Sequence, residues 1–352
     1  MKDQATSLRN LVQGKTEYTV GRGAAKPSPP PVKPVFSLSQ GSPSPLSGGG
    51  ASAAPIYSST MPSLPSLTSL PGASPPIFRP VIHRSGEARI VAVTSGKGGV
   101  GKTNLTVNLA IALAREGQRV IVIDADLGMA NVDVVLGTVS KYHLMHLLQP
   151  DISLQDVLVQ GPYGVNYISG GSAIEQAVEL SASERQKLMD KLAVCGEMAD
   201  IILVDTGAGL GQSVLDFILA ADEVLLVTTP EPTALTDAYA VMKAYSFHAD
   251  NKNLRIIVNR VYDEAESRDV LMKLQRTAER FLRLPLEALG SVYEDRNVMN
   301  AVKRQSPLLA AYPNTLASRC VEAIAKNLLY GGRHEVQWGW RGFLQRLLKF
   351  KD

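Results

Sequence analysis

The chain has 352 residues, of which 45% are hydrophobic and 20% are charged, and this composition excludes a wholly disordered chain and a collagen-like rod. No uninterrupted apolar run reaches the about 18 residues that a membrane-spanning helix needs. The formal net charge of +3 arises after residue 332, and the neutral remainder predicts no specific binding of nucleic acid.

Residues 1–13 predict a short helix that needs a partner. Asp3 is a candidate N-cap, and Ala5, Leu8 and Val12 fall on one side of the helix. Isolated helices of this length are marginal in water, so the alternative is a disordered start without a partner. The start also lacks the apolar core of a secretory signal, and the chain has two cysteines in all, which favours a reducing cytoplasm.

Residues 14–86 predict a disordered linker. Fourteen of the 21 prolines lie between positions 27 and 80, where Ser and Gly are abundant and Asp and Glu are absent. Such a segment buries too little apolar surface to offset its ordering entropy. About 70 residues of flexible chain reach roughly 45 Å, so the first 13 residues are expected to act anywhere around the following domain or on another molecule.

From residue 88 onward, short apolar, β-branched runs alternate with segments of helical period. The apolar runs are RIVAVTS, RVIVIDAD, VNYIS, DIILVDT, EVLLVTT and LRIIVNR. Helical segments follow most of them, at 104–116, 182–195, 235–247, 265–282 and 315–328. Strands that are apolar on both faces are typical of a parallel sheet covered by helices. Residues 87–331 are therefore predicted to form one doubly wound α/β domain with a mainly parallel sheet.

The first of these strands leads into SGKGGVGKT, which satisfies the P-loop pattern with a strand before it and a helix after it. Glycines let successive backbone N–H groups converge on phosphate oxygens, and the helix adds the positive end of its dipole. Lys102 is expected to reach the β- and γ-phosphates, and Thr103 to bind Mg²⁺. The alternative is a glycine-rich turn that binds nothing. The predicted nucleotide-binding positions here are Gly96, Lys97, Gly98, Gly99, Val100, Gly101, Lys102, Thr103 and Asn104.

Lys97 lies at the second position of this loop, where a lysine marks the deviant Walker A motif. In this feature the sequence resembles the MinD/ParA class of dimerising ATPases. The resemblance implies that Lys97 reaches the nucleotide of a partner subunit and that the ATP-bound protein is a homodimer. The alternative is a surface lysine beside a glycine turn.

Three aspartates follow predicted strands. Asp124 and Asp126 end one strand and Asp205 ends another, and the carboxyl ends of parallel strands form the ligand-binding edge of such a sheet. The resemblance implies that Asp205 holds hydrated Mg²⁺, that Asp126 orients the attacking water and that Asp124 supports the metal and the loop. Lys97, Lys102 and Asp126 are thus the expected catalytic residues. The alternative is that one aspartate, Asp124 above all, only caps a helix.

Recognition of the base is expected after two further strands. By resemblance, Asn259 and Arg260 match the adenine-contacting position, and Glu231 belongs to the loop TPEP that faces the purine. An asparagine amide can donate to and accept from an adenine edge at once. No NKxD pattern suited to guanine is evident, so ATP is preferred to GTP. A simple turn between strand and helix is the alternative.

Residues 332–352 predict an amphipathic helix. Its apolar positions recur at helical spacing between basic residues, a pattern typical of a helix that lies on a membrane surface. These positions are Trp340, Phe343, Leu344, Leu347 and Leu348. One such tail is expected to bind lipid weakly, whereas two tails in an ATP-held dimer bind together. The alternative is that the helix folds back onto its own domain, and the two states are able to alternate.

The two ends and the ATPase motifs together resemble the FlhG family, which regulates flagellar number and placement. The family-like phrases are the leading DQATSLR, DADLGMANVDVVLG, DTGAGLG and EPTALTDAYAVMK. The resemblance implies slow, switch-like ATP hydrolysis, location at the inner face of the cell membrane, and flagellar basal-body or transcriptional regulator proteins as partners. It also implies stimulation of the GTPase FlhF by the N-terminal motif, whose expected partner-binding residues are Asp3, Gln4, Ala5, Leu8 and Arg9.

Three other functions are alternatives to this interpretation. A MinD-type division-site or ParA-type DNA-partition ATPase shares the fold, but the leading motif and the long linker argue against it. A metal-cluster carrier of the Mrp or nitrogenase-reductase type lacks support, because the two cysteines are far apart and form no C-x-x-C pair. A scaffold that binds ATP without hydrolysing it has the same residues and is left open.

Overall fold

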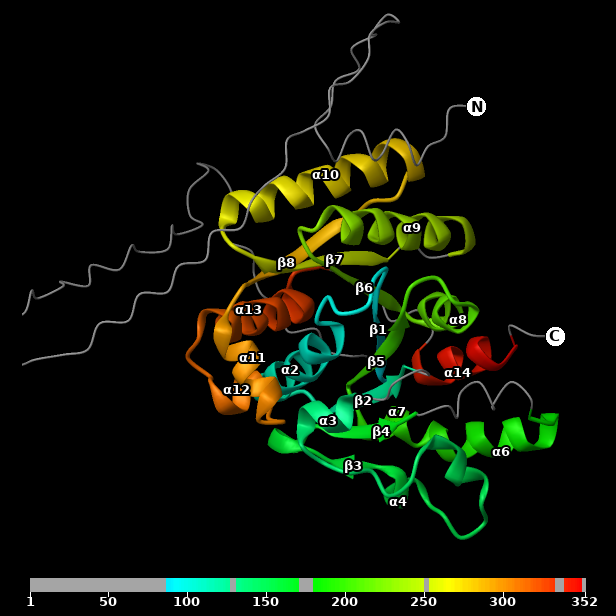
Figure 1. Cartoon of the computed structure of the whole chain (residues 1–352). Helices are drawn as coiled ribbons and strands as arrows, with labels where there is room; N and C mark the ends of the chain where they lie inside the picture. The colour runs from blue at the N-terminus through cyan, green and yellow to red at the C-terminus, as the bar shows by residue number, and fades with distance from the viewer. Residues whose placement is uncertain (1–86, 127–130, 171–179, 250–252, 333–338, 350–352) are drawn as a thin grey trace, which may run out of the picture. The chain divides into compact units, whose positions relative to one another are not determined.

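The computed structural model describes residues 87–126, 131–170, 180–249, 253–332 and 339–349. The predicted N-terminal helix and linker, residues 1–13 and 14–86, lie outside the described residues and stay predictions. The described residues from 87 to 332 form an α/β domain with helices on both faces of a sheet (Figure 1).

One eight-stranded sheet organises the domain, in the order β3-β4-β2-β5-β1-β6-β7-β8. Neighbouring strands are parallel except for β3, which runs antiparallel to β4. The bounds are β1 Arg89–Ser95, β2 Val120–Ala125, β3 Val159–Gln160, β4 Asn166–Ser169, β5 Ile201–Ala208, β6 Glu223–Thr228, β7 Leu254–Val261 and β8 Glu287–Tyr293. All six predicted strands are confirmed. The edge strand β8 gave no continuous apolar run, because only two of its seven residues are buried.

The helices of the described chain cover both faces of the sheet. Their bounds are α2 Lys102–Arg115, α3 Val132–Leu136, α4 Leu154–Val157, α6 Ala182–Ala193, α7 Cys195–Met198, α8 Gln212–Ala220, α9 Pro232–His248, α10 Glu264–Leu282, α11 Arg296–Lys303, α12 Leu308–Ala311, α13 Leu316–Tyr330 and α14 Gly339–Lys349. The five predicted helical segments correspond to α2, α6, α9, α10 and α13. Sequence reasoning missed α8, whose nine residues QSVLDFILA are too short and too apolar to show a helical period.

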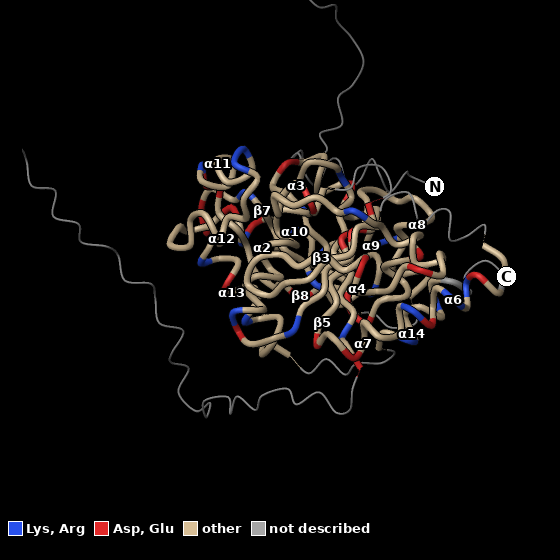
Figure 2. The backbone as a smooth tube through the Cα atoms, turned by 90° about the horizontal axis from the view of Figure 1, so that it is seen from below, with Lys and Arg blue, Asp and Glu red and all other residues tan. Residues whose placement is uncertain are grey.

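Alternate residues of each strand enter different cores. Ile90 and Ala92 of β1 pack with α6, α8, α9, α10 and α14, whereas Val91 and Val93 pack with α2, α12 and α13. This arrangement confirms the predicted doubly wound fold. Because helices cover both faces, the carboxyl ends of the parallel strands form the open edge at which a ligand can bind. Basic and acidic residues are interspersed around the described chain (Figure 2).

The predicted C-terminal helix is present as α14, and it lies against the domain. Trp340, Phe343 and Leu344 are buried, and the indole Nε1 of Trp340 donates a hydrogen bond to the carbonyl oxygen of Leu192 in α6. The ring of Phe343 stacks on that of Phe217 in α8, with centroids 6.3 Å apart. Three side chains expected to meet a membrane therefore complete the hydrophobic core here, which is the fold-back alternative.

The remaining apolar positions of α14 lie at its end. Leu347 is partly buried against the same core, and the side chain of Leu348 lies outside the described residues. None of the helices in the described ranges combines the length and the apolar character needed to cross a bilayer.

Candidate functional site

The phosphate loop connects β1 to α2, and it is packed against the domain at Gly96 but open at Gly98 and Gly99. A Cβ atom added to Gly96 would lie 2.3 Å from the carbonyl oxygen of Asp237, so the loop packs directly on the backbone of α9. A Cβ atom added to Gly98 or Gly99 would meet nothing within 4 Å. The space beside these two glycines is therefore open, as a loop that receives phosphate oxygens requires.

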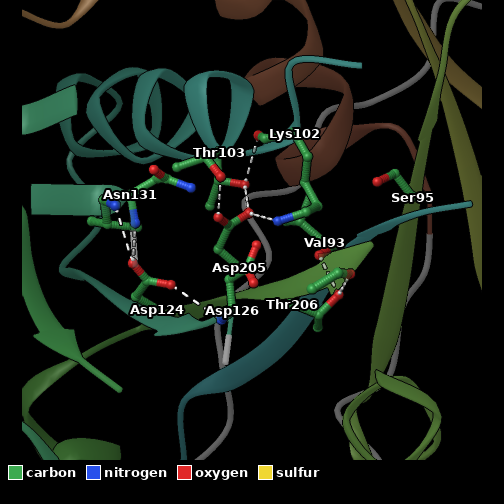
Figure 3. A network of polar contacts seen from close by, with 12 residues as sticks. Val93, Ser95, Lys102, Thr103, Asp124, Asp126, Asn131, Asp205 and Thr206 are labelled. Carbon is green, nitrogen blue, oxygen red and sulfur yellow. Dashed lines mark hydrogen bonds and ion pairs between the residues drawn. The ribbon is translucent and has the colours of Figure 1, made fainter. Parts of the chain in front are cut away.

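Two side chains from the start of α2 meet the end of β5 beside this loop (Figure 3). The ammonium Nζ of Lys102 lies 3.1 Å from Oδ1 of Asp205, and Oγ1 of Thr103 donates to Oδ2 of the same carboxylate at 2.6 Å. Lys102 and Asp205 are both buried, and apart from this ion pair the Lys102 ammonium has no hydrogen-bond partner among the described residues. A buried cation with unused donors suits an incoming anion.

Thr106 also belongs to this cluster, and sequence reasoning missed it. Its Oγ1 donates to Oδ1 of Asp205 at 2.8 Å. The sequence did contain a signal for Thr106: it lies three residues after Thr103, so the two hydroxyl groups are on the same side of α2. Hydroxyl and carboxylate oxygens are ligands that Mg²⁺ prefers, and Mg²⁺ usually completes its shell with water and substrate phosphates. The residues present therefore fit a magnesium–nucleotide complex.

Asp124 is the second-last residue of β2 and binds the start of α3. Its Oδ2 accepts hydrogen bonds from the backbone N–H groups of Asn131 and Val132 at 2.9 and 3.0 Å, and its Oδ1 accepts from that of Asp126 at 3.1 Å. Burial raises the pKa of Asp124 to about 6, and the charge of Asp205 adds to that rise while the N–H donors oppose it. In this structure Asp124 organises the chain after β2, as the helix-cap alternative states. Its support of a metal stays a prediction.

Asp126 lies at the same edge, beside the end of β5. A Cβ atom added to Gly207 would be 3.7 Å from Oδ1 of Asp126, so this carboxylate lies beside the backbone of Gly207 in β5. Asp126 is partly exposed, and residues 127–130, which follow it, lie outside the described residues. Its expected role in orienting water stays a prediction.

Lys97 contacts the loop between β6 and α9 of its own chain. Its Nζ lies 2.7 Å from Oε2 of Glu231 and 3.0 Å from Oγ1 of Thr233. The ammonium of Lys97 holds the pKa of Glu231 below its usual value, and Arg260 contributes to the same shift. The two side chains are 38% and 56% exposed, so water screens this ion pair and Lys97 can exchange partners.

The predicted adenine contacts cluster at the end of β7. The amide Nδ2 of Asn259 donates to the carbonyl oxygen of Val100 at 2.7 Å, and the backbone N–H of Arg260 donates to Oδ1 of Asn259 at 3.0 Å. Asn104 lies in α2, where its Oδ1 accepts from Asn108 at 3.2 Å while its own Nδ2 is buried without a hydrogen-bond partner in the described part of the chain. The structure thus brings Asn259 and Arg260 to the phosphate loop. The predicted partner-binding residues Asp3, Gln4, Ala5, Leu8 and Arg9 lie outside the described residues.

Comparison with known proteins identifies relatives of this chain. Residues 87–329 match the family described as ParA: NUBPL iron-transfer P-loop NTPase. The antiactivator FleN of Pseudomonas aeruginosa is 40% identical over 240 residues, which cover 68% of this chain and 86% of FleN. The flagellum site-determining protein YlxH of Helicobacter pylori is 36% identical over 271 residues, which cover 75% of this chain and 91% of YlxH.

Solved structures of MinD proteins share the fold. The MinC:MinD cell division protein complex of Aquifex aeolicus matches with a TM-score of 0.57 and 26% identity, covering 72% of this chain and all of that one. MinD of Pyrococcus horikoshii in complex with Mg-ADP matches with a TM-score of 0.53 and 27% identity, covering 68% and 96%. The P-loop NTPase fold is therefore shown by both sequence and structure.

The two cysteines give no support for carrying an iron–sulfur cluster. Cys195 packs into the core on one face of the sheet, and Cys320 packs against the core on the other face. Burial raises the pKa of the Cys195 thiol to about 12, which keeps it protonated. Within the described ranges, no three His, Cys, Asp or Glu side chains come together as a metal site.

The open glycine loop, the buried lysine and the carboxylate–hydroxyl cluster are the parts that a P-loop NTPase needs to bind and hydrolyse a nucleoside triphosphate. FleN and YlxH match this chain over most of their own length. The chain is an ATPase and belongs to the FlhG (YlxH/FleN) family of MinD/ParA-type P-loop NTPases.

Proposed function

We propose that this ATPase is a nucleotide-dependent switch that controls the number and placement of flagella. The observation that carries the proposal is the match to FleN and YlxH, which are named as an antiactivator and a flagellum site-determining protein. ATP and Mg²⁺ are its proposed substrate and cofactor, supported by the match to a MinD bound to Mg-ADP.

Each residue of the site has a proposed part in hydrolysis. The open backbone at Gly98 and Gly99 binds phosphate oxygens, and Lys102 neutralises negative charge on the β- and γ-phosphates. Thr103 and Asp205 hold Mg²⁺, which when bound supplies positive charge to the reacting phosphate. Asp126 orients the attacking water.

Dimerisation is proposed to require that Lys97 leave Glu231. In the single chain the ammonium of Lys97 is held by its own β6–α9 loop, so it is not directed away from the subunit. An exposed ion pair of this kind is readily exchanged for a phosphate of a second subunit. The homodimer formed in this way would contain two nucleotides and two copies of α14.

The release of α14 is the proposed link between nucleotide and membrane. Helix α8 is the next helix after β5, the strand that carries Asp205. The last turn of α8 contacts α14, because Arg346 Nη1 donates to the carbonyl oxygen of Leu219 at 3.1 Å. A shift of α8 when nucleotide binds would therefore weaken the docking of α14. Released Trp340, Phe343 and Leu344 would then insert into the lipid surface.

Flotation with vesicles that contain anionic lipid tests this link. The unaltered protein is expected to float with a non-hydrolysable ATP analogue and to stay in solution with ADP, and Lys97→Ala is expected to stay in solution with both. The variant Gly196→Val leaves α14 unchanged but crowds it, since a Cβ atom at Gly196 would lie 3.1 Å from Cβ of Trp340. It is expected to float weakly without ATP, as one freed tail should, and more strongly with the ATP analogue. Flotation of the Lys97→Ala protein at full strength would contradict the proposal.

The flagellar part of the proposal is tested with the GTPase FlhF. The full chain and a chain that lacks residues 1–12 are titrated against FlhF while GTP hydrolysis is followed. Stimulation by the full chain alone supports the N-terminal motif as the activating segment. Equal rates of GTP hydrolysis with the two chains would show that the N-terminal motif does not stimulate FlhF.

A second candidate is a division-site or DNA-partition ATPase. It is favoured by the match to the putative septum site-determining protein MinD of Nephroselmis olivacea, which is 34% identical over 247 residues covering 68% of this chain and 87% of that relative. Parallel binding assays with FlhF, MinC and DNA distinguish the two functions. Binding to MinC or DNA without binding to FlhF would favour this second candidate.

A further inference from the structure

We propose that Asn259 is a positioning residue that holds the phosphate loop in its binding conformation from the end of β7. This role is distinct from contact with adenine, because it acts on the loop whether or not a base is present. The inference rests on the proposed ATP site and deepens it. It concerns how strongly the loop binds phosphates, and through them any nucleotide.

The amide of Asn259 bridges two backbone segments that are distant in the sequence. Nδ2 donates to the carbonyl oxygen of Val100 in the phosphate loop at 2.7 Å, and Oδ1 accepts from the backbone N–H of Arg260 at 3.0 Å. Only one orientation of the amide puts its donor against a carbonyl and its acceptor against an N–H group. The two hydrogen bonds therefore define the orientation of the Asn259 amide and connect β7 to the phosphate loop.

The backbone on both sides is shaped for this contact. Gly101 has φ +92, and a Cβ atom there would lie 2.5 Å from Nδ2 of Asn259, so only glycine leaves space for the amide. Arg260 has φ 60, a left-handed conformation that residues other than glycine adopt rarely. The side chain of Val100 is buried, which anchors the same peptide from its other side. The geometry thus holds Val100 at both its side chain and its carbonyl group.

The hydrogen bond from Asn259 to Val100 is important for phosphate binding because the loop is rich in glycine. Gly98, Gly99 and Gly101 surround Val100, and glycine has more backbone freedom to lose on ordering than any other residue. A loop already held in position loses less freedom when phosphate binds, so its affinity rises. Asn259 also keeps one N–H and one lone pair unused in these two bonds, so a base contact remains chemically open to it.

The first test measures, without nucleotide, hydrogen exchange of the backbone amide of Leu105, which donates to the carbonyl oxygen of Gly101 at the end of the loop at 2.9 Å. Asn259→Ala is expected to raise the exchange rate of this amide by about tenfold, the effect of one lost hydrogen bond of about 1.4 kcal/mol. Asn253→Ala is the matched control: Asn253 precedes the other end of β7 and donates its Nδ2 to the carbonyl oxygen of Asp222 at 3.2 Å. The control is expected to leave the loop unchanged. Exchange at the unaltered rate in Asn259→Ala would overturn the proposal.

The second test compares magnesium ATP with magnesium tripolyphosphate, which has no base or ribose, by competition against a fluorescent ATP analogue. Asn259→Ala is expected to weaken both ligands by a similar factor of about ten and to raise the KM for ATP more than it lowers kcat. If Asn259→Ala bound only ATP more weakly, and bound ATP and GTP with equal affinity, Asn259 would recognise the base. That result would overturn the positioning role. Asn259→Ser, whose side chain is too short to reach Val100, replaces the alanine variant should that variant fail to fold.

These outcomes separate the inference from the proposed function. If the unaltered protein binds no ATP, the proposed function fails, although the exchange test still reports on the loop. If it binds ATP and the loop in Asn259→Ala is unchanged, only the positioning role fails.

Discussion

The two edges of the sheet both bury charge, and they differ in what surrounds it. At the amino-terminal edge, Glu223 forms ion pairs with Arg89 and Arg255, and all three side chains are buried. At the carboxyl-terminal edge, Lys102 pairs with Asp205, and both are equally buried. The charged pairs alone do not distinguish the edges.

The difference lies in the neighbouring backbone. Beside Lys102 the glycines of the phosphate loop face open space. Beside Glu223, the described residues form no such loop. Arg89 donates a hydrogen bond to the carbonyl oxygen of Leu328 in α13, so a helix packs directly against these charged side chains. In this domain, the buried ion pair that belongs to the candidate ligand site is therefore the one beside an open glycine loop. The same kind of pair in a closed environment serves the fold.

Lys102→Ala tests the open edge and has the largest expected effect. Loss of this cation from the developing phosphate charge should lower ATP hydrolysis by about 10³-fold. Water can reach the site beside the open loop, so Lys102→Ala should lower the free energy of unfolding less than a substitution at Glu223, on the amino-terminal edge, where the charged side chains are covered by α13. Phosphate release and urea unfolding measure the two effects. If the Lys102→Ala protein hydrolysed ATP at the unaltered rate, the carboxyl-terminal edge of the sheet would not be the catalytic site.

Glu223→Ala tests the closed edge. It leaves the guanidinium groups of Arg89 and Arg255 buried without their common partner, which should lower the free energy of unfolding by about 3–5 kcal/mol. ATP affinity of the folded fraction should stay unchanged, and urea unfolding with parallel ATP binding measures both. Loss of ATP binding at full stability would show that the two edges are not independent.

The stability of the metal-free protein should depend on pH through Asp124. The pKa of its carboxyl group is 3.8 in the ordinary state and about 6 when folded, so between these values the folded state binds more protons than the unfolded state. The free energy of unfolding should therefore fall by about 2–3 kcal/mol as the pH rises from about 4 to above 6, because each pH step of one between the two pKa values removes about 1.4 kcal/mol. Urea unfolding from about pH 4.5 to about pH 7.5 measures this slope. Asp124→Asn should flatten it, and an equal slope in that variant would assign the effect elsewhere.

Glu231→Gln has the smallest expected effect. It removes the charge that holds Lys97 in its own subunit, so ATP-dependent dimerisation should strengthen by about two- to threefold. Analytical ultracentrifugation with a non-hydrolysable ATP analogue measures the change. The gain should shrink at high salt, because salt screens exposed ion pairs. A weaker dimer would mean that Glu231 supports the dimer rather than competing with it.

Short-range patterns in the sequence were enough for the interior of the domain. The six apolar runs became strands because a strand buried on both faces needs apolar residues at every position, which is a local signal. The phosphate loop was equally readable, since its glycines, Lys102 and Thr103 follow one another directly. The strand β8 was missed because an edge strand needs no such run.

The sequence by itself determined the fold class, the phosphate loop and the residues that end the central strands. Only the tertiary structure decided which of them meet: Lys97 with Glu231, Asn259 with Val100, and Thr106 with Asp205. It also decided that Trp340 and Phe343 of α14 pack into the domain. The physical reason is that an apolar helix face or a spare amide fits several partners equally well, and the folded chain alone selects the partner that lies within reach.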